Sequence, residues 1–304
     1  MKDSNLATDG WSDYELLDSG DNKKLERFGA YILIRPETQA IWKPLHPELW
    51  KQATAEFTFN KDKGSWRGKN VPDTWDIAWR DGTHFSLRTG SFKHTGIFPE
   101  QAANWGWIGE RVDALAKRAP QGGADNAGAQ PKVLNLFGYT GIASIVATQH
   151  GAMVTHLDAS KQSNTWAREN ATLSGVAADT LRFITDDALT FVEREIRRGS
   201  VYDGIILDPP AFGRGPDGEV WHIEEDIIPL LGAVQKIFSQ KPGSFFLLNG
   251  YAAGYAPQSL LQAVESAFSE IASKKIMGEF GELHISEKNS GRVVPSGIYI
   301  RFVR

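Results

Sequence analysis

An acidic residue followed by two prolines is the feature of this sequence best suited to chemistry. Asp208, Pro209 and Pro210 come directly after residues 204–207, an apolar run that predicts a buried parallel strand. Ligands of open α/β sheets bind beside the carboxyl ends of the strands, so Asp208 is predicted to lie at that edge. Proline has no backbone N–H, and the corner therefore offers only hydrogen-bond acceptors. Such a corner suits a nucleophilic nitrogen that carries hydrogens, although a plain proline-rich turn is the structural alternative.

The elements that would position this corner alternate along the second half of the chain. Helical segments separate seven apolar, strand-like runs, at residues 132–137, 153–157, 181–184, 204–207, 244–248, 274–279 and 297–303. Strands that alternate with helices predict an α/β fold with a mostly parallel sheet covered on both faces. The last two runs have no long helix between them, which predicts a C-terminal antiparallel hairpin whose linking loop is residues 289–297.

A turn with two glycines follows the first of these strands. Gly138 and Gly141 lie between that strand and a helix predicted to begin near Ile142. Glycines at such a turn let a ligand approach the backbone closely, and the helix N-terminus favours an anion. The Gly-x-x-Gly spacing differs from the Gly-x-Gly-x-x-Gly pattern of dinucleotide sites, so a dinucleotide is disfavoured. A tight turn without a ligand is the alternative.

Two further strands also end in acidic residues. Asp158 closes the second strand, where an acidic side chain can bind a ribose diol. Asp186 and Asp187 follow the third strand, where a carboxylate could accept a hydrogen bond from an adenine amino group. Either of these two could equally be a helix N-cap. Together with Asp208, the acidic strand ends suit a ligand that has an adenosine and a carboxylate but no phosphate.

The first third of the chain predicts a small β-rich domain. Short strand-like runs lie between Tyr14 and Leu87, and we predict one domain over residues 1–93 and a second over residues 94–304. An amphipathic helix is predicted within residues 99–118 and a flexible connector over 119–131. Residues 61–69 interleave basic side chains with Trp66, a pattern that can stack on bases and contact phosphates. A solvated hairpin tip over a tryptophan-rich core is the alternative for that stretch.

Composition excludes several kinds of chemistry. The 304 residues include no cysteine, which removes disulfides, cysteine metal ligands and thiolate nucleophiles. The seven histidines have no metal-ligand spacing, so we predict no metal site. A net charge of −4 gives no global basic field, and a nucleic-acid partner would need a local patch. The sequence has neither a membrane-spanning apolar run nor the pattern of a signal peptide, and we expect a cytoplasmic protein without a membrane partner.

These features resemble the class I S-adenosylmethionine-dependent methyltransferases, more narrowly the bacterial large-subunit ribosomal RNA methyltransferases that modify cytosine C5 or guanine N7. The resemblance covers roughly residues 93–304 and rests on residues 95–101, 134–141, 167–171, the Asp187 segment and residues 207–212. It implies a Rossmann-like methyltransferase sheet preceded by the small β-rich domain. It also implies S-adenosylmethionine as cofactor, held by Phe98, Gln101, Asn135, Phe137, Gly138, Tyr139, Thr140, Asp158, Ala159, Ser160, Asn170, Asp186, Asp187, Ala188 and Asp208.

The catalytic residues implied are Asp208, Pro209, Pro210 and Phe212. Phe212 could stack on the acceptor and Arg214 could bind a nearby phosphate, with a loop anchor and a solvated loop charge as the respective alternatives. Cytosine C5 methylation in that group uses a cysteine nucleophile, which this chain lacks. We therefore predict methyl transfer to a nitrogen of an RNA base, with ribosomal RNA bound through a local basic and aromatic patch. The alternatives are a methyltransferase acting on a protein or small molecule, a non-catalytic cofactor-binding or RNA-binding scaffold and, more distantly, a nicotinamide enzyme. The oligomeric state is not predicted.

Overall fold

The structure is a computed structural model that describes residues 1–60, 63–68, 71–90, 92–118, 130–251, 254–272, 276 and 278–304. The chain divides into two compact units. The first comprises Met1–Asn5, Asn104–Glu282 and Gly297–Arg304, and the second comprises Leu6–Ala103 and Leu283–Ser296. Most of the predicted connector, residues 119–129, lies outside the described residues. The predicted domain boundary between residues 93 and 94 stays a prediction.

The sheet of the first unit has the order β1-β17-β18-β16-β13-β10-β11-β12. Its strands are β1 (Lys2–Asp3), β10 (Lys132–Leu136), β11 (Met153–Asp158), β12 (Leu181–Thr185), β13 (Gly204–Leu207), β16 (Phe245–Gly250), β17 (Gly278–Ser286) and β18 (Val293–Val303). The five central strands, β16 to β12 in this order, are parallel. β18 runs antiparallel to β16, so the predicted parallel sheet with a reversed edge is confirmed.

The last two strands are longer than the sequence indicated. β17 continues to Ser286 and β18 already begins at Val293, and both strands extend into the second unit. The prediction that residues 289–297 form the linking loop is therefore wrong in its second half, because Val293 to Gly297 are part of β18. Proline and serine are common in loops, yet Pro295 and Ser296 lie within β18 and Ser296 is buried.

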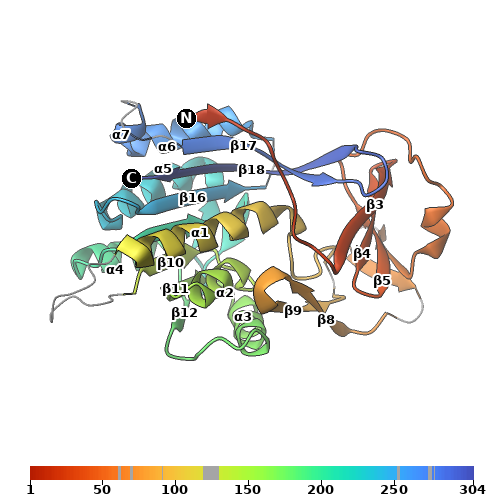
Figure 1. The fold of residues 1–304 in the computed structure, drawn as a ribbon, viewed down its shortest axis with the longest axis horizontal. Helices are drawn as coiled ribbons and strands as arrows, with labels where there is room; N and C mark the ends of the chain where they lie inside the picture. The colour runs from red at the N-terminus through yellow and green to blue at the C-terminus, as the bar shows by residue number, and fades with distance from the viewer. Residues whose placement is uncertain are drawn as a thin grey trace. The chain divides into compact units, whose positions relative to one another are not determined.

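Helices cover both faces of the central strands (Figure 1). One face carries α1 (Ala102–Arg118), α2 (Ile142–Gln149) and α3 (Lys161–Leu173), and the other carries α4 (Ala188–Arg197), α5 (Ile223–Ile237), α6 (Pro257–Ala267) and the short α7 (Ser269–Ala272). The change of face follows from right-handed crossovers, because the chain moves along the sheet in one direction up to β12 and then returns to β13. No helix in the described parts of the chain is long and apolar enough to cross a membrane.

Alternating residues of each strand pack against opposite helical layers. Leu134 and Leu136 of β10 belong to the large apolar core that includes Phe191 of α4 and Leu231 of α5. Asn135, between them, points the other way and donates to Ser144 of α2. Strands buried on both faces account for the near-continuous apolar runs in the sequence.

The second unit is built from β strands, which confirms the predicted β-rich N-terminal region. Its five-stranded sheet has the order β3-β4-β5-β6-β7, and a separate hairpin joins β8 to β9. The strands are β2 (Leu6–Ala7), β3 (Tyr14–Gly20), β4 (Lys23–Phe28), β5 (Tyr31–Pro36), β6 (Ala55–Asn60), β7 (Lys63–Gly68), β8 (Thr74–Trp79) and β9 (Thr83–Arg88), with 3₁₀ turns at Leu49–Gln52, Arg80–Gly82 and Pro99–Gln101. β7 is an edge strand of the five-stranded sheet.

A buried ion pair fixes the interior of this second unit. Arg35 binds both carboxylate oxygens of Glu26, at 2.7 and 2.8 Å, and the Tyr14 hydroxyl donates to the same carboxylate at 2.8 Å. Burial opposes ionisation of Glu26, but Arg35 and Lys24 outweigh that cost and lower its pKa to about 2. The charge-assisted hydrogen bonds hold β3, β4 and β5 in one arrangement.

Candidate active site

The carboxyl ends of four adjacent strands bring the predicted acidic residues to one edge of the sheet. Leu136, the last residue of β10, pairs with Leu157 on one side and with Leu207 on the other. Asp158 and Asp208 are the next residues of those two neighbouring strands. Asp186 follows β12, which is the strand beyond Asp158. The register thus sets three acidic strand ends around the loop that leaves β10.

That loop, residues 137–141, has an unusual backbone. Phe137 and Tyr139 have φ values of 58° and 49°, which are uncommon for residues other than glycine, and Gly141 has a φ of 87°. A Cβ on Gly138 would lie 2.3 Å from Cε1 of His156, so this position requires glycine. The hydrogen bonds that hold the loop include those from Gly138 N to the Leu157 carbonyl at 2.9 Å and from Asn170 Nδ2 to the Thr140 carbonyl at 2.9 Å. The predicted site residue Asn170 is therefore buried and positions the loop.

Asp158 orders the turns on both sides of it. One carboxylate oxygen accepts from Tyr139 N and the other from Ser160 N, each at 2.8 Å. Burial raises the pKa of the Asp158 carboxyl group, and the two backbone hydrogen bonds oppose this rise without cancelling it. Ala159 is half-buried and Ser160 is exposed. The carboxylate is thus held in a fixed orientation at the end of β11.

Asn164 is a site residue that the sequence reasoning missed. Its buried Nδ2 donates to the carbonyls of Asp158 and Ile184, both at 3.0 Å, and to Oγ1 of Thr185 at 2.9 Å. It therefore joins the ends of β11 and β12. The available signal was its position four residues after Ser160, the N-cap of α3, because side chains at that spacing share one face of a helix.

The helices that follow β10, β11 and β12 have different N-termini. Ser160 caps α3 and Asp187 caps α4 through their side-chain oxygens. At α2 the N-cap is Gly141, and no side chain caps that helix. The first N–H groups of a helix carry partial positive charge and require acceptors. The start of α2 therefore suits an anionic group beside the glycine loop.

The two aspartates after β12 have internal partners. Asp186 accepts from Asp187 N at 3.0 Å and forms an ion pair with Arg194. Asp187 accepts from Thr190 N at 2.8 Å, and Ala188, the first residue of α4, is buried. The N-cap alternative considered for this pair is thus the geometry found at Asp187.

Replacement of Asp187 tests its structural role. Asp187→Ala removes the cap of α4 and is expected to lower the free energy of unfolding by about 1 kcal/mol. Asp187→Ser retains a capping oxygen and is expected to lower it by a few tenths of a kcal/mol at most. Urea titrations followed by far-UV circular dichroism measure both values. Equal losses in the two variants would contradict a capping role.

Asn135 lies in the interior beneath the glycine loop. Its amide donates to Ser144 Oγ at 2.8 Å, and that hydroxyl lies 3.0 Å from Nδ1 of His156. Burial, and secondarily Arg168, lowers the pKa of His156 to about 3, so the ring is neutral. Two further predicted residues, Phe98 and Gln101, belong to the second unit at the Pro99–Gln101 turn. Ligand roles for these residues stay predictions.

The double-proline corner is followed by a hairpin that the sequence did not reveal. Its strands are β14 (Phe212–Arg214) and β15 (Val220–His222). Trp221 donates its indole N–H to the Pro210 carbonyl at 2.7 Å. Its ring also lies 4.9 Å from that of Phe137, measured between centroids. Trp221 thus connects the corner to the glycine loop, and its proximity to the prolines in sequence was the only signal.

The groups around the corner differ in exposure. Pro209 is buried and Pro210 is exposed, whereas the Asp208 residue is half-buried and its N–H donates to the Leu136 carbonyl at 3.3 Å. Phe212 is 52% exposed, and its ring lies 5.1 Å from that of His222. Within the described ranges, no group of three or more histidine or acidic side chains could hold a metal ion. The edge thus combines fixed acceptors with an accessible aromatic ring.

Comparisons with known proteins bear on the family and the fold of this chain. The family model described as S-adenosylmethionine-dependent methyltransferase matches residues 58–221. The crystal structure of the SAM-dependent methyltransferase from Agrobacterium tumefaciens is similar over 99% of this chain and 93% of that chain, with 38% identity and a TM-score of 0.87.

Curated relatives share a part of their length with this chain. Ribosomal RNA large subunit methyltransferase K/L of Shewanella loihica is 31% identical over 170 residues, which is 55% of this chain and 21% of the relative. The protein of the same name from Magnetococcus marinus is 26% identical over 251 residues, which is 81% of this chain and 31% of the relative. The chain thus spans between a fifth and a third of the length of these relatives.

Proposed function

The chain belongs to the S-adenosylmethionine-dependent methyltransferase family, and on this premise we propose that it methylates a nitrogen of an RNA base. The observation that carries the proposal is the Asp208-Pro209-Pro210 corner at the end of β13, next to the loop that leaves β10. The corner supplies acceptors and no proline N–H, which matches an acceptor nitrogen that bears hydrogens. The corner does not match a methylated atom that needs hydrogen-bond donors from the protein.

The residues at the strand ends fit S-adenosylmethionine. Asp158 offers an ionisable carboxylate of fixed orientation for the ribose hydroxyls. The uncapped start of α2 offers N–H groups for the carboxylate of the cofactor. The carboxylate of Asp187 can accept from the adenine amino group through the oxygen that does not cap α4. A pyrophosphate would instead require the closely spaced glycines that this loop lacks.

S-adenosylmethionine supplies a methyl group already activated by its sulfonium, so the contribution of the protein is alignment. We propose that Asp208 and the Pro209 carbonyl orient the acceptor nitrogen, whose lone pair forms the new N–C bond as the S–C bond breaks. An acceptor that carries a proton loses it to Asp208 or to water. Phe212, exposed beside His222, stacks on the acceptor base. Trp221 holds the corner by its bond to the Pro210 carbonyl.

The choice of nitrogen rests on composition as well as geometry. Methylation of cytosine C5 through covalent attack at carbon 6 needs a thiolate, and the chain has no cysteine. A ring or exocyclic nitrogen has its own lone pair and needs no such intermediate. We therefore propose an N-methyltransferase in preference to a C5-methyltransferase.

RNA as the substrate is supported by the names of the curated relatives and by the surface of β7. These relatives are named ribosomal RNA large subunit methyltransferases. Lys63 and Arg67 of β7 are exposed, and they lie on either side of Trp66 in sequence. Basic side chains with an aromatic ring can bind the backbone and bases of single-stranded RNA. Residues 61, 62 and 69 of the predicted basic stretch lie outside the described residues.

The test combines methyl transfer with the salt dependence of binding. Deproteinised ribosomal RNA is incubated with the protein and S-adenosylmethionine labelled in its methyl group, and the methylated nucleoside is identified by mass spectrometry. We expect an N-methylated base, and RNA binding that weakens roughly tenfold or more between about 50 and about 200 mM KCl, as contact with three phosphates predicts. Label that enters only protein or a small molecule, or a salt-independent Kd, would overturn RNA as the substrate.

A further inference from the structure

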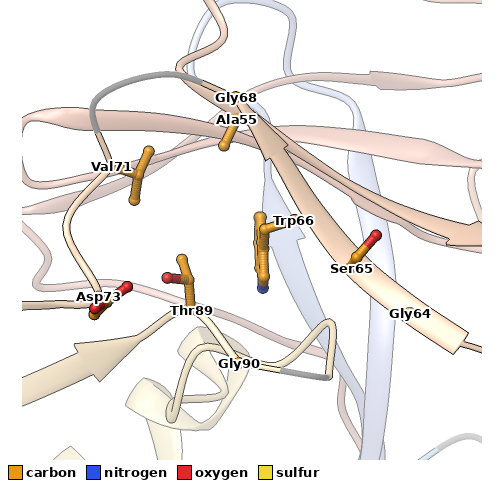
Figure 2. A pocket seen from close by; sticks show the side chains of 9 residues that line it. All are labelled: Ala55, Gly64, Ser65, Trp66, Gly68, Val71, Asp73, Thr89 and Gly90. Atoms are coloured by element: carbon orange, nitrogen blue, oxygen red, sulfur yellow. The ribbon is translucent and has the colours of Figure 1, made fainter.

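The second unit contains an open pocket that the proposed chemistry does not use. Its volume is about 380 Å³, and it lies between β7 and the segments that flank the β8-β9 hairpin (Figure 2). The residues that matter for its chemistry are Ala55, Trp66, Val71, Asp73, Thr89 and Gly90. This volume falls in the lower part of the range for small-molecule sites, about 300–1,000 Å³.

Trp66 forms a flat wall of this pocket. It lies on the edge strand β7, and its side chain alternates with those of its neighbours Ser65 and Arg67 across the strand. The indole N–H donates to the Phe92 carbonyl at 3.3 Å, and Phe57 packs against the ring with centroids 5.4 Å apart. Figure 2 shows the ring nearly edge-on, with open space between one of its faces and Val71. The ring is therefore held in place while this face remains accessible.

The opposite side of the pocket carries polar groups. Asp73 and Thr89 lie across the open space from Trp66 (Figure 2). A backbone hydrogen bond from Thr89 N to the Asp73 carbonyl, at 3.1 Å, holds the two residues together. The Asp73 carboxylate has no hydrogen-bond or ion-pair partner among the described residues and is exposed to solvent. An ionised carboxylate only accepts hydrogen bonds, so its natural partner is an amino group.

The pocket has the shape and the groups needed for a flat, hydrogen-bonding heterocycle. Stacking on an indole face suits any nucleobase, whereas the carboxylate selects bases with an exocyclic amine over those that present a carbonyl at that edge. Lys63 and Arg67 lie on the same edge strand but project from its other face, so they can hold only phosphates of RNA backbone that passes around the strand edge. These charges disfavour a free cationic ligand, although Asp73 alone would accept one.

We infer that this pocket binds an unpaired RNA base that carries an exocyclic amine, stacked on Trp66 with its amine donating to Asp73. The inference rests on the proposed RNA substrate and adds a second contact point for it, within the β-rich unit. Such a site would select which single-stranded segment of the RNA is bound, independently of the base that is methylated.

Cytosine and uracil provide a matched pair of probes, because cytosine carries an amine at position 4 where uracil carries a carbonyl. Fluorescence anisotropy with labelled hexamers of cytidine and of uridine gives the two Kd values. We expect the wild-type protein to bind the cytidine hexamer at least about tenfold more tightly, as one hydrogen bond to a charged group predicts. Asp73→Asn, whose amide can donate as well as accept, is expected to bring this ratio near one.

Three further variants complete the test: one removes the stacking ring, one fills the pocket and one is a charge control. Trp66→Leu is expected to weaken binding of both hexamers about tenfold. Gly90→Leu places a side chain where a Cβ meets nothing within 4 Å, and is expected to block the pocket without disturbing the fold. Asp76→Asn on β8 makes the same charge change as Asp73→Asn at another exposed position and should keep the wild-type ratio. Because net charge affects both hexamers alike and the double-proline corner is unchanged in these variants, the change of the ratio from its wild-type value reports on the pocket.

The outcomes separate this inference from the proposed function. A wild-type ratio near one, or wild-type affinity in both Trp66→Leu and Gly90→Leu, would overturn the pocket site even if ribosomal RNA is methylated. Loss of the ratio in Asp73→Asn but not in Asp76→Asn, together with retained thermal stability, supports it. A wild-type protein that binds no RNA would overturn the RNA substrate and this site together.

Discussion

Asp208→Asn is expected to lower kcat for methyl transfer by about 10²–10³-fold while the Kd for S-adenosylmethionine changes by less than about threefold. The acceptor must stand in line with the bond that breaks, and misplacement by about 1 Å can cost 10²-fold in rate. The substituted amide retains one acceptor oxygen but loses the negative charge and can present an N–H to the acceptor nitrogen instead. The strand itself is unaffected, because Asp208 is bound to Leu136 through its backbone N–H.

The measurement is a single-turnover assay with deproteinised ribosomal RNA and labelled cofactor, beside calorimetric titration of the cofactor. Asp203→Asn is the matched control, because Asp203 lies at the opposite end of the same strand and accepts from Lys132 N at 3.1 Å. It should keep kcat within about twofold of the wild-type value. A wild-type kcat in Asp208→Asn would remove the carboxylate from the mechanism, and a large rise in cofactor Kd would make Asp208 chiefly a cofactor ligand.

The fold was predictable because its central strands are buried on both faces. Residues 204–207 were bounded correctly, since an apolar run flanked by Asp203 and Asp208 leaves little freedom. The β14-β15 hairpin was not predictable, because strands of three residues each are too short to show a periodic signal. The start of β18 was missed because Pro295 reads as a loop residue, although a proline close to a strand end can be accommodated.

The acidic residues of the candidate site were predictable, but their partners were not. Strand ends follow from hydrophobic runs, so Asp158 and Asp208 could be placed at one edge from the sequence alone. Asn164 could not, since its three acceptors come from two different strands. The contact between Phe137 and Trp221 likewise depends on a left-handed backbone at Phe137 that residue type does not reveal. Long-range side-chain contacts require the tertiary structure.

Asp158→Asn is expected to raise the Kd for S-adenosylmethionine about 10- to 100-fold, because it removes the charge from hydrogen bonds worth about 1.5–3 kcal/mol. The same carboxylate also orders the glycine loop through Tyr139 N, so the loss combines ligand contact and loop order. Asp179→Asn, an exposed change of the same charge on the loop before β12, should leave the Kd unchanged. S-adenosylhomocysteine serves as the unreactive ligand for calorimetry.

The pH dependence of protein stability and of cofactor binding provides a second, independent test of the role of Asp158. Burial raises the pKa of Asp158 above its usual 3.8, so the carboxyl group takes up a proton in the folded protein at a higher pH than in the unfolded chain. As the pH falls through that interval, proton uptake by Asp158 stabilises the free protein, yet cofactor binding, which needs the ionised carboxylate, weakens. Asp158→Asn should abolish both trends, whereas Asp179→Asn should keep them. Thermal unfolding is measured at each pH with and without S-adenosylhomocysteine. The difference between the wild type and the variants isolates the contribution of Asp158. Equal pH trends in the wild type and in Asp158→Asn would refute the assignment of Asp158 to the cofactor.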